Sequence, residues 1–406
     1  METPALWLLP FAALLLSIAV LPLALPERWG RPGFQALVAA VAALPVVIGR
    51  PGALGHVASE YVSFVLLLGS LYVVTSGIRV TGDIPAHPAT NVGLLLVGGL
   101  LASVIGTTGA SMLLIRLVLE VNSERKNVSH TVLFFILIVS NVGGCLTPLG
   151  DPPLFLGYLA GVPFFWTLRL VEEWALALAV LLTTYFFVER RRYAAEPREA
   201  IRADETTRRP IRLSGRWNLP LLCGIVAATA FLEAPYREAA YLSCAVLSFP
   251  LTPRGQRTET RFSWHPILEV AILFAGIFVT MEPALAVLRE HAPTLGLTRP
   301  WQFFWATGTL SAWLDNAPTY AAFLALARGL GRPEVAGVPE KVLEAISTGA
   351  VFFGALTYIG NGPNFLVRSI AVSRGVAMPS FFGYAARAAA VLLPLFVLIT
   401  LLFFPF

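Results

Sequence analysis

The stretch GCLTPLGDPPLFL at residues 144–156 is repeated, 210 residues later, as GALTYIGNGPNFL at residues 354–366. Seven of the thirteen aligned positions are identical: Gly144/Gly354, Leu146/Leu356, Thr147/Thr357, Gly150/Gly360, Pro153/Pro363, Phe155/Phe365 and Leu156/Leu366. Glycine and proline interrupt helices, and both stretches lie in very apolar surroundings. In lipid, non-helical backbone is tolerated only where protein buries it or where it lines a cavity. The sequence therefore predicts two broken helices inside a membrane protein.

The composition supports a membrane location. The chain has 406 residues, of which 56% are hydrophobic and 13% are charged, whereas about 25% of residues are charged in ordinary soluble domains. Residues 3–26 carry no charge and are long enough to cross about 30 Å of hydrocarbon as a helix. Because no Lys or Arg precedes this segment, we expect it to be retained as the first span and not cleaved as a signal peptide.

The basic residues are concentrated in one stretch. Nine of the 29 lie between Arg190 and Arg216, so the net charge of +5 does not indicate nucleic-acid binding. The positive-inside rule predicts that this stretch is cytoplasmic, with both termini outside the cell. We expect it to act as an orientation signal and tether, with a lipid-headgroup or regulatory contact as the alternative. The three cysteines and five histidines show no metal or redox spacing, so no cofactor is expected.

The duplication extends well beyond the opening motif. SFVLLLGSLYVVTSGI at 63–78 aligns with LEVAILFAGIFVTMEP at 268–283, and IGTTGASM at 105–112 aligns with WLDNAPTY at 313–320. The offset between copies changes by only a few residues along the chain, as expected for one duplicated unit of about 200 residues. Paired, Gly/Pro-interrupted hydrophobic segments of this kind are typical of the binding site of a secondary transporter.

These patterns predict an all-α integral membrane protein in the plasma membrane, the inner membrane of the cell. It would have two inverted-topology repeats, residues 1–188 and 217–406, joined by a basic cytoplasmic linker at 189–216. Each repeat should contain about five transmembrane helices plus a re-entrant hairpin, with discontinuous helices. The expected segments are 5–25, 33–49, 60–79, a hairpin at 92–120, a broken helix at 130–160, and 170–188. In the second repeat they are 217–232, 238–251, 265–288, a hairpin at 300–328, a broken helix at 341–373, and 382–404.

Four breaks should therefore converge near the middle of the membrane: 106–110, 147–153, 314–318 and 357–364. Broken helices expose backbone carbonyl and N–H groups, and small oxygen-bearing side chains stand beside them. The candidate ligands for an ion or substrate are Thr107, Thr108, Thr147, Asp151, Asp315, Asn316, Thr357, Asn361 and Asn364. Hard cations such as Na⁺ bind oxygen ligands of this kind, whereas an anion would seek the positive N-terminal ends of the half-helices.

Two acids lie inside the breaks, Asp151 and Asp315. A carboxylate at membrane depth costs several kcal/mol and is by default a candidate functional residue. Each could instead cap a helix, Asp151 the helix that resumes at Pro152 and Asp315 the helix that starts near Ala317. Because a buried carboxylate can exchange a proton for a cation, we expect Asp151, Asp315, Asn316 and Asn361 to bind Na⁺. Glu269 and Asn141 are expected in a supporting shell around this site.

Four segments resemble the ion transporter superfamily, most closely its bacterial branch labelled sodium/proton antiporter or citrate transporter. They are SNVGGCLTPLGDPPLFL (140–156), LEVAILFAGIFVTMEPAL (268–285), LDNAPT (314–319) and GALTYIGNGPNFLV (354–367). The resemblance implies paired Na⁺ and substrate sites at two hairpin tips and two unwound segments. The implied residues are Thr107, Thr108, Gly109, Thr147, Pro148, Asp151, Asp315, Asn316, Pro318, Thr357, Asn361, Pro363 and Asn364. Dicarboxylate carriers of this superfamily carry Ser-Asn-Thr at both tips, where this chain has Thr-Thr-Gly and Asp-Asn-Ala.

Two acids at one site would repel an organic anion unless both were neutralised, whereas they suit a monovalent cation directly. The sequence therefore favours a Na⁺/H⁺ antiporter that works by alternating access, with a cation-coupled citrate or organic-anion transporter as the alternative. A channel or a non-transporting scaffold would be expected to show a continuous polar stripe, and the acids are instead confined to the breaks. The expected partners are the lipid bilayer and a small inorganic cation or organic anion. An enzyme is not indicated, and a homodimer is one assembly that such a chain could form.

Overall fold

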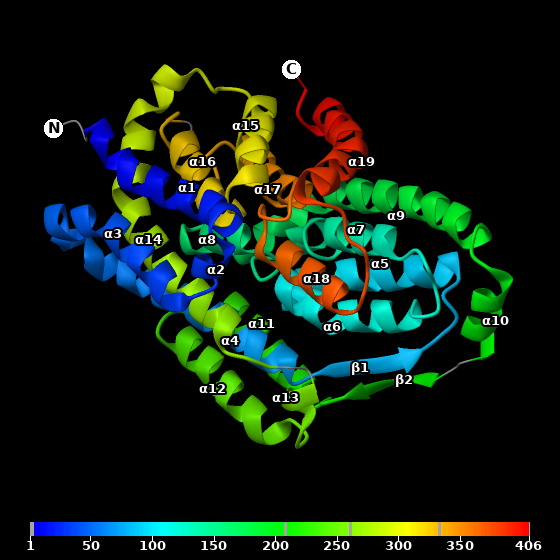
Figure 1. The fold of residues 1–406 in the computed structure, drawn as a ribbon. Helices are drawn as coiled ribbons and strands as arrows, with labels where there is room; N and C mark the ends of the chain where they lie inside the picture. The colour runs from blue at the N-terminus through cyan, green and yellow to red at the C-terminus, as the bar shows by residue number, and fades with distance from the viewer. Residues whose placement is uncertain (1–3, 207–208, 260–261, 332–333, 406) are drawn as a thin grey trace.

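The structure, a computed structural model, describes residues 4–206, 209–259, 262–331 and 334–405 and is mostly helical (Figure 1). Within these ranges, eight helical segments are long and apolar enough to cross a membrane. They are Ala5–Ala24, Pro32–Gly49, Leu54–Ser76, Pro88–Ile105, Ser129–Leu146, Phe164–Ala194, His265–Leu295 and Phe381–Phe403. Every segment expected from the sequence is matched by helix, with ends that differ by a few residues.

The first half of the chain forms a series of helices that ends in the long α9. Its helices are α1 (Leu8–Ala24), α2 (Pro26–Trp29), α3 (Pro32–Gly49), α4 (Leu54–Ser76), α5 (Pro88–Ile105), α6 (Thr107–Val121), α7 (Ser129–Ile138), α8 (Pro152–Leu159) and α9 (Val171–Ala194). Short 3-10 turns lie at Ala5–Trp7, Pro51–Ala53, Val142–Leu146 (η3) and Phe164–Leu170 (η4). The expected hairpin corresponds to α5 and α6, and the expected broken helix to α7, η3 and α8.

The second half repeats this order of elements. Its helices are α11 (Asn218–Phe231), α12 (Tyr236–Leu251), α13 (Gln256–Glu259), α14 (His265–His291), α15 (Pro300–Trp313), α16 (Asn316–Arg328), α17 (Glu340–Phe353), α18 (Gly362–Ser373) and α19 (Phe381–Phe403). The 3-10 turns are Ala292–Leu295 and Gly354–Leu356 (η6). The second hairpin is therefore α15 and α16, and the second broken helix is α17, η6 and α18. Both breaks occur where the sequence repeats its Gly/Pro motif.

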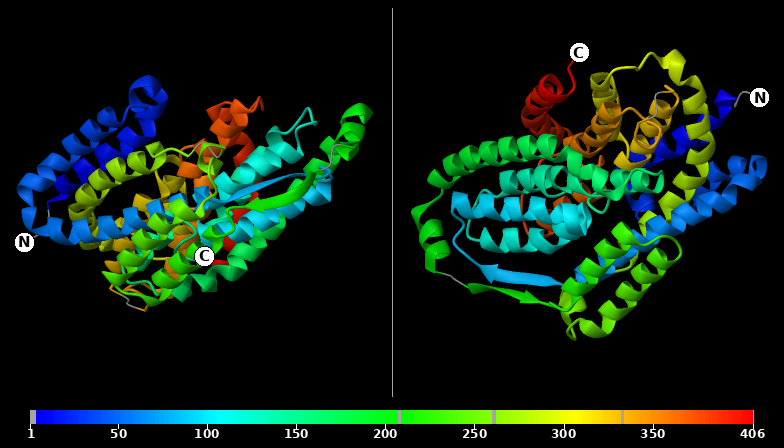
Figure 2. Two further views of the ribbon diagram at one scale, coloured as in Figure 1. Left: turned by 90° about the horizontal axis from the view of Figure 1, so that it is seen from below. Right: turned by 180° about the vertical axis from the view of Figure 1, so that it is seen from behind.

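The two halves exchange packing partners. Helix α4 of the first half packs against α11 and α12 of the second, and α14 of the second half packs against α1 and α3 of the first (Figures 1 and 2). In the same way, α8 contacts α16 and α17, while α18 contacts α6 and α7. Neither half buries its own broken helix alone, and this exchange brings breaks that are about 200 residues apart in sequence to one place.

The linker is more than the tether that the sequence suggested. It contains α10 (Arg198–Thr206) and β2 (Arg209–Ser214), and β2 pairs antiparallel with β1 (Arg79–Asp83) (Figure 1). The Asp204 carboxylate also accepts hydrogen bonds from the backbone N–H of Ala86, at 3.0 and 3.2 Å. A two-stranded sheet is therefore added to the mostly helical fold that the sequence predicted. Short, charged segments 130 residues apart carry no alternation that would predict their pairing.

Candidate functional site

Four helices begin around one cavity. They are α6 at Thr107, α8 at Pro152, α16 at Asn316 and α18 at Gly362. The cavity has a volume of about 120 Å³. Its polar wall comes from all four breaks and includes Thr107, Thr108, Gly109, Gly150, Pro152, Asp315, Asn316, Asn361, Gly362 and Pro363. A helix N-terminus leaves backbone N–H groups unpaired and carries about half a positive charge, so the wall holds four positive dipole ends.

The opposite wall of the cavity is apolar. It consists of Leu68, Leu71 and Tyr72 from α4 and Pro266, Ile267, Val270 and Phe274 from α14. Tyr72 lies one turn before the end of α4, which leads into β1, and its hydroxyl donates to the carbonyl of Ser263 at 2.9 Å. Pro266 lies in the first turn of α14, which begins directly after Ser263 and Trp264. This part of the cavity is therefore close to the β1–β2 pair that the linker contributes to. The cavity therefore lies between the four breaks and the side of the molecule that carries the linker.

Asp151 lies behind the polar wall and joins the breaks to one another. It is 1% exposed and accepts hydrogen bonds from three side chains. Thr107 Oγ1 and Asn361 Nδ2 each donate to Oδ1 at 2.9 Å, and Asn316 Nδ2 donates to Oδ2 at 2.6 Å. Each donor comes from a different break, so one carboxylate fixes four chain segments. Buried charges are stable in protein interiors when they are hydrogen-bonded in this way.

Asp315 has a different environment, since this residue is part of the cavity lining. Its Oδ1 accepts the backbone N–H of Ala317 at 3.0 Å and thereby caps α16. Capping and a position on the cavity, which the sequence left as alternatives, coexist in this residue. An ion or substrate in the cavity would meet the carboxylate of Asp315, whereas it would reach Asp151 only through the side chains that bond to it.

The candidate asparagines divide into two groups. Asn316 and Asn361 line the cavity. Asn364 is fully buried and donates to the carbonyls of Gly354 and Thr357, at 2.8 and 2.9 Å, so it holds the second break in shape. Asn141 donates to Asn364 Oδ1 at 2.7 Å, and its own Oδ1 accepts from Asn361 Nδ2 at 3.3 Å. The structure thus places Asn141 directly behind the cavity wall.

The other candidates lie at different distances from the cavity. Thr108 lines it, whereas Thr147 and Thr357 attach each broken helix to its hairpin. Thr147 donates to the carbonyl of Ser103, and Thr357 donates to that of Ala312 at 2.5 Å. Glu269 does not line the cavity and accepts a hydrogen bond from Gln35 Nε2 of α3 at 2.8 Å. The structure does not bring Glu269 together with the other candidate residues.

The repeated glycines permit the close chain crossing at each break. A Cβ atom on Gly150 would lie 2.1 Å from the carbonyl oxygen of Gly144, and one on Gly360 would lie 2.6 Å from that of Gly354. Distances this short require the backbone to move. The two glycines therefore set the shape of the two breaks, which explains in physical terms why the motif carries them in both copies.

Replacing Gly150 with alanine is expected to destabilise the protein by about 3 kcal/mol or more, because overpacking against rigid backbone exceeds the usual cost of about 1–3 kcal/mol. The matched control is Gly93→Ala in α5, where an added Cβ meets nothing within 4 Å. Thermal unfolding in detergent, followed by size-exclusion chromatography, measures both variants. A Gly150→Ala protein as stable as Gly93→Ala would show that the break is packed differently.

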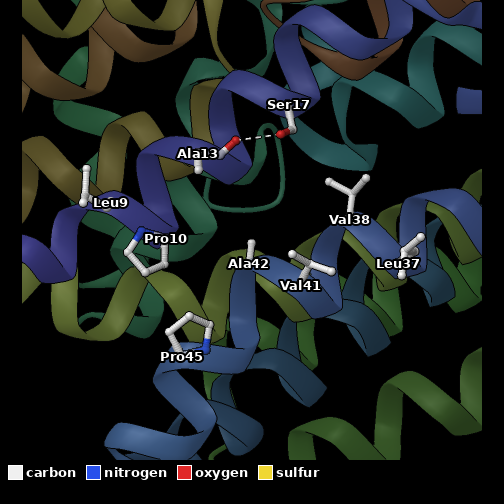
Figure 3. A pocket seen from close by; sticks show the side chains of 9 residues that line it. All are labelled: Leu9, Pro10, Ala13, Ser17, Leu37, Val38, Val41, Ala42 and Pro45. Atoms are coloured by element: carbon white, nitrogen blue, oxygen red, sulfur yellow. Dashed lines mark hydrogen bonds between the residues drawn. The ribbon is translucent and has the colours of Figure 1, made fainter.

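A second and larger hollow lies elsewhere, between α1 and α3. Its volume is about 550 Å³, and it is lined by Leu9, Pro10, Ala13, Ser17, Leu37, Val38, Val41, Ala42 and Pro45 (Figure 3). Its single hydroxyl, that of Ser17, donates to the carbonyl of Ala13 at 2.7 Å. Among the described residues, no charged or amide side chain lines it, so this part of the chain offers an ion nothing to bind there. The four-break cavity is therefore the better candidate despite its smaller volume.

A protein-family model described as "Putative citrate transport" matches residues 1–404, almost the whole chain. The chain belongs to this family. The resemblance seen in the repeated motifs is thereby confirmed for the citrate transporter branch. Together with the eight candidate spans, membership makes the chain a multi-pass membrane transporter. No curated protein matches the chain.

Two further acids are deeply buried, Glu173 of α9 (2% exposed) and Glu344 of α17 (5% exposed). The sequence did not identify either of them as a candidate residue. Both lie near the start of an apolar helix, a position at which acids usually reach water. Glu173 follows another acid, Glu172, which is exposed. Sequence alone gives no reason to distinguish these neighbours, because the difference arises from packing between segments distant along the chain.

Proposed function

We propose that this protein carries an organic anion of the citrate type across the plasma membrane together with a cation. The observation that carries the proposal is the convergence of four helix N-termini, those of α6, α8, α16 and α18, on one cavity. Unpaired N–H groups and aligned dipoles at helix N-termini bind carboxylates. Family membership points to the same class of substrate.

The cation follows from the acid in the same wall. Asp315 would repel a polycarboxylate unless a cation or proton neutralised it. Na⁺ bound by oxygens of Asp315 and neighbouring residues, or a proton on Asp315, would remove this repulsion and couple the two solutes. Asp151 would keep Thr107, Asn316 and Asn361 in place, through the three hydrogen bonds that they donate to it. Asp151 then acts by positioning the wall, and Asp315 by contacting the occupant.

The size of the cavity implies movement. Its volume of about 120 Å³ corresponds to roughly four water molecules at about 30 Å³ each, less than the usual size of a small-molecule site. We infer that the apolar wall of α4 and α14 separates from the breaks to admit substrate. Such movement would be alternating access, in which the site opens to one side of the membrane at a time. This mechanism would be supported by two inverted repeats, re-entrant hairpins α5–α6 and α15–α16, and a cytoplasmic linker.

Na⁺/H⁺ antiport, which the sequence favoured over the organic-anion transporter, is now the second candidate, and one specific observation supports it. Among the residues that the structure describes, no Lys, Arg or His lines the cavity, and its present volume suits a partly hydrated cation. An antiporter would need only Asp315 and its oxygen neighbours. The two functions differ in whether an organic anion is required.

Purified protein in liposomes separates them. We expect labelled citrate to accumulate when an inward Na⁺ or proton gradient is imposed, and we expect a Na⁺ gradient alone to produce little pH change inside the vesicles. Vesicles with heat-inactivated protein provide the control. Rapid Na⁺-driven alkalinisation or acidification without any organic anion, and no citrate uptake, would favour the antiporter.

A further inference from the structure

A second group of buried acids lies on the side of the molecule opposite the linker. Glu173 is in the first turn of α9, and Ala194, which leads into the linker, ends the same helix. The 21 helical steps from Glu173 to Ala194 span about 32 Å at about 1.5 Å per residue. Glu173 and Glu344 thus lie on the far side of the four breaks from the cavity, which is on the linker side.

One carboxylate oxygen of this group has no partner. Within the described part of the chain, Glu173 Oε2 is buried and makes no hydrogen bond. Glu344 Oε2 accepts from Lys341 Nζ at 2.5 Å, and Lys341 extends to the surface. The charged groups that act on Glu173 are Glu344, Lys341 and the exposed Glu172. An unpaired, ionised oxygen at this depth is costly, and binding a proton removes the cost.

Polar side chains on one face of α17 lie between Glu344 and the second break. Glu340, Glu344 and Ser347 are spaced by four and three residues, so they form a stripe along α17. Ser347 lies beside the buried hydroxyl of Tyr320, one turn after Asn316 on α16. Helix α17 itself ends at Phe353, directly before the second break. A change of charge at Glu344 is therefore placed to affect the second hairpin and the second break of the candidate site.

We propose that Glu173 and Glu344 form a proton-binding site that couples transport to the pH gradient. The inference rests on the proposed transport function and names its coupling site on the face opposite the linker. In the binding step, a proton from water forms an O–H bond with the Glu173 carboxylate, and the reverse step returns it to water. Glu344 stays paired with Lys341 and stabilises the protonated form of Glu173, because two nearby carboxylates do not readily ionise together.

The test compares Glu173→Gln with Glu172→Gln, its exposed neighbour. In liposomes, we expect Glu173→Gln to keep citrate counterflow within about twofold of wild type, whereas accumulation driven by a pH gradient should fall at least about tenfold. Glu172→Gln should behave as wild type in both assays. Glu173→Gln that accumulates citrate normally, or Glu172→Gln that loses as much, would overturn the proposal.

Infrared spectroscopy gives a readout that does not depend on citrate. The carboxylic-acid carbonyl band that appears on acidification should be weakened in Glu173→Gln and unchanged in Glu172→Gln, and an unchanged band in both would overturn the proposal. Should Glu173→Gln fail to fold, Glu173→Asp retains the carboxyl group and should retain the band. If wild-type protein shows neither citrate uptake nor counterflow, the transport proposal fails, and the infrared result still decides whether the site binds a proton.

Discussion

Asp151→Asn is expected to destabilise the protein by about 2 kcal/mol or more and to abolish transport. Hydrogen bonds to a charged acceptor contribute about 1.5–3 kcal/mol each, and Asp151 accepts three. Asparagine retains one oxygen for Thr107 and Asn361 but turns its own NH₂ toward the NH₂ of Asn316. Thermal unfolding of the purified variant measures the stability, and labelled-citrate uptake measures the activity.

Swapping the carboxylate of Asp151 with the amide of Asn316 provides the internal control for this prediction. In the double variant Asp151→Asn/Asn316→Asp, the amide and the carboxylate trade places, so the pair can form again. We expect the double variant to be more stable than either single variant. Asn316→Asp alone places two carboxylates together and should be the least stable of the three. Equal stability of Asp151→Asn and wild type would show that Asp151 does not hold the breaks together.

Asp315→Asn is expected to keep the fold and lose transport. Asparagine caps helices about as well as aspartate, so stability should change by less than about 1 kcal/mol. The variant nevertheless removes the one acidic side chain found in the described cavity lining. We expect citrate uptake to fall at least about 100-fold, equivalent to a coupling energy of about 3 kcal/mol.

The matched control for Asp315 removes a helix cap elsewhere. Ser380 caps α19 by accepting the N–H of Gly383 at 3.2 Å, and it does not line the cavity. Ser380→Ala should cost about 1 kcal/mol of stability, the usual cost of a lost cap, and leave uptake unchanged. Uptake by Asp315→Asn at the wild-type rate would remove Asp315 from the transport mechanism.

These two experiments separate acids that sequence alone treated alike. Gly, Pro and Thr at Gly150, Pro153 and Thr147 are enough to predict a broken helix, because their backbone requirements are local. The partners of Asp151 are not local, since Asn316 and Asn361 come from the other half of the chain. The sequence could therefore place both acids at the breaks but could not show which of them faces the cavity.

Contacts between distant segments also account for the features that the sequence did not predict. The pairing of β1 with β2 and the burial of Glu173 and Glu344 depend on contacts between distant segments, and each segment has an ordinary local pattern. The helices were predictable because hydrophobic length is a local property that the membrane enforces. The apolar wall from α4 and α14 was not, since Leu71 and Phe274 resemble any lipid-facing residue.

The central claim is that substrate binds where α6, α8, α16 and α18 begin. Electron cryomicroscopy of the protein in lipid nanodiscs, with and without citrate and Na⁺, tests it most directly. The account predicts added density between Thr107, Asp315, Asn316 and Gly362, and its loss in Asp315→Asn. Citrate density located away from these helix starts, in a preparation that transports citrate, would contradict the account.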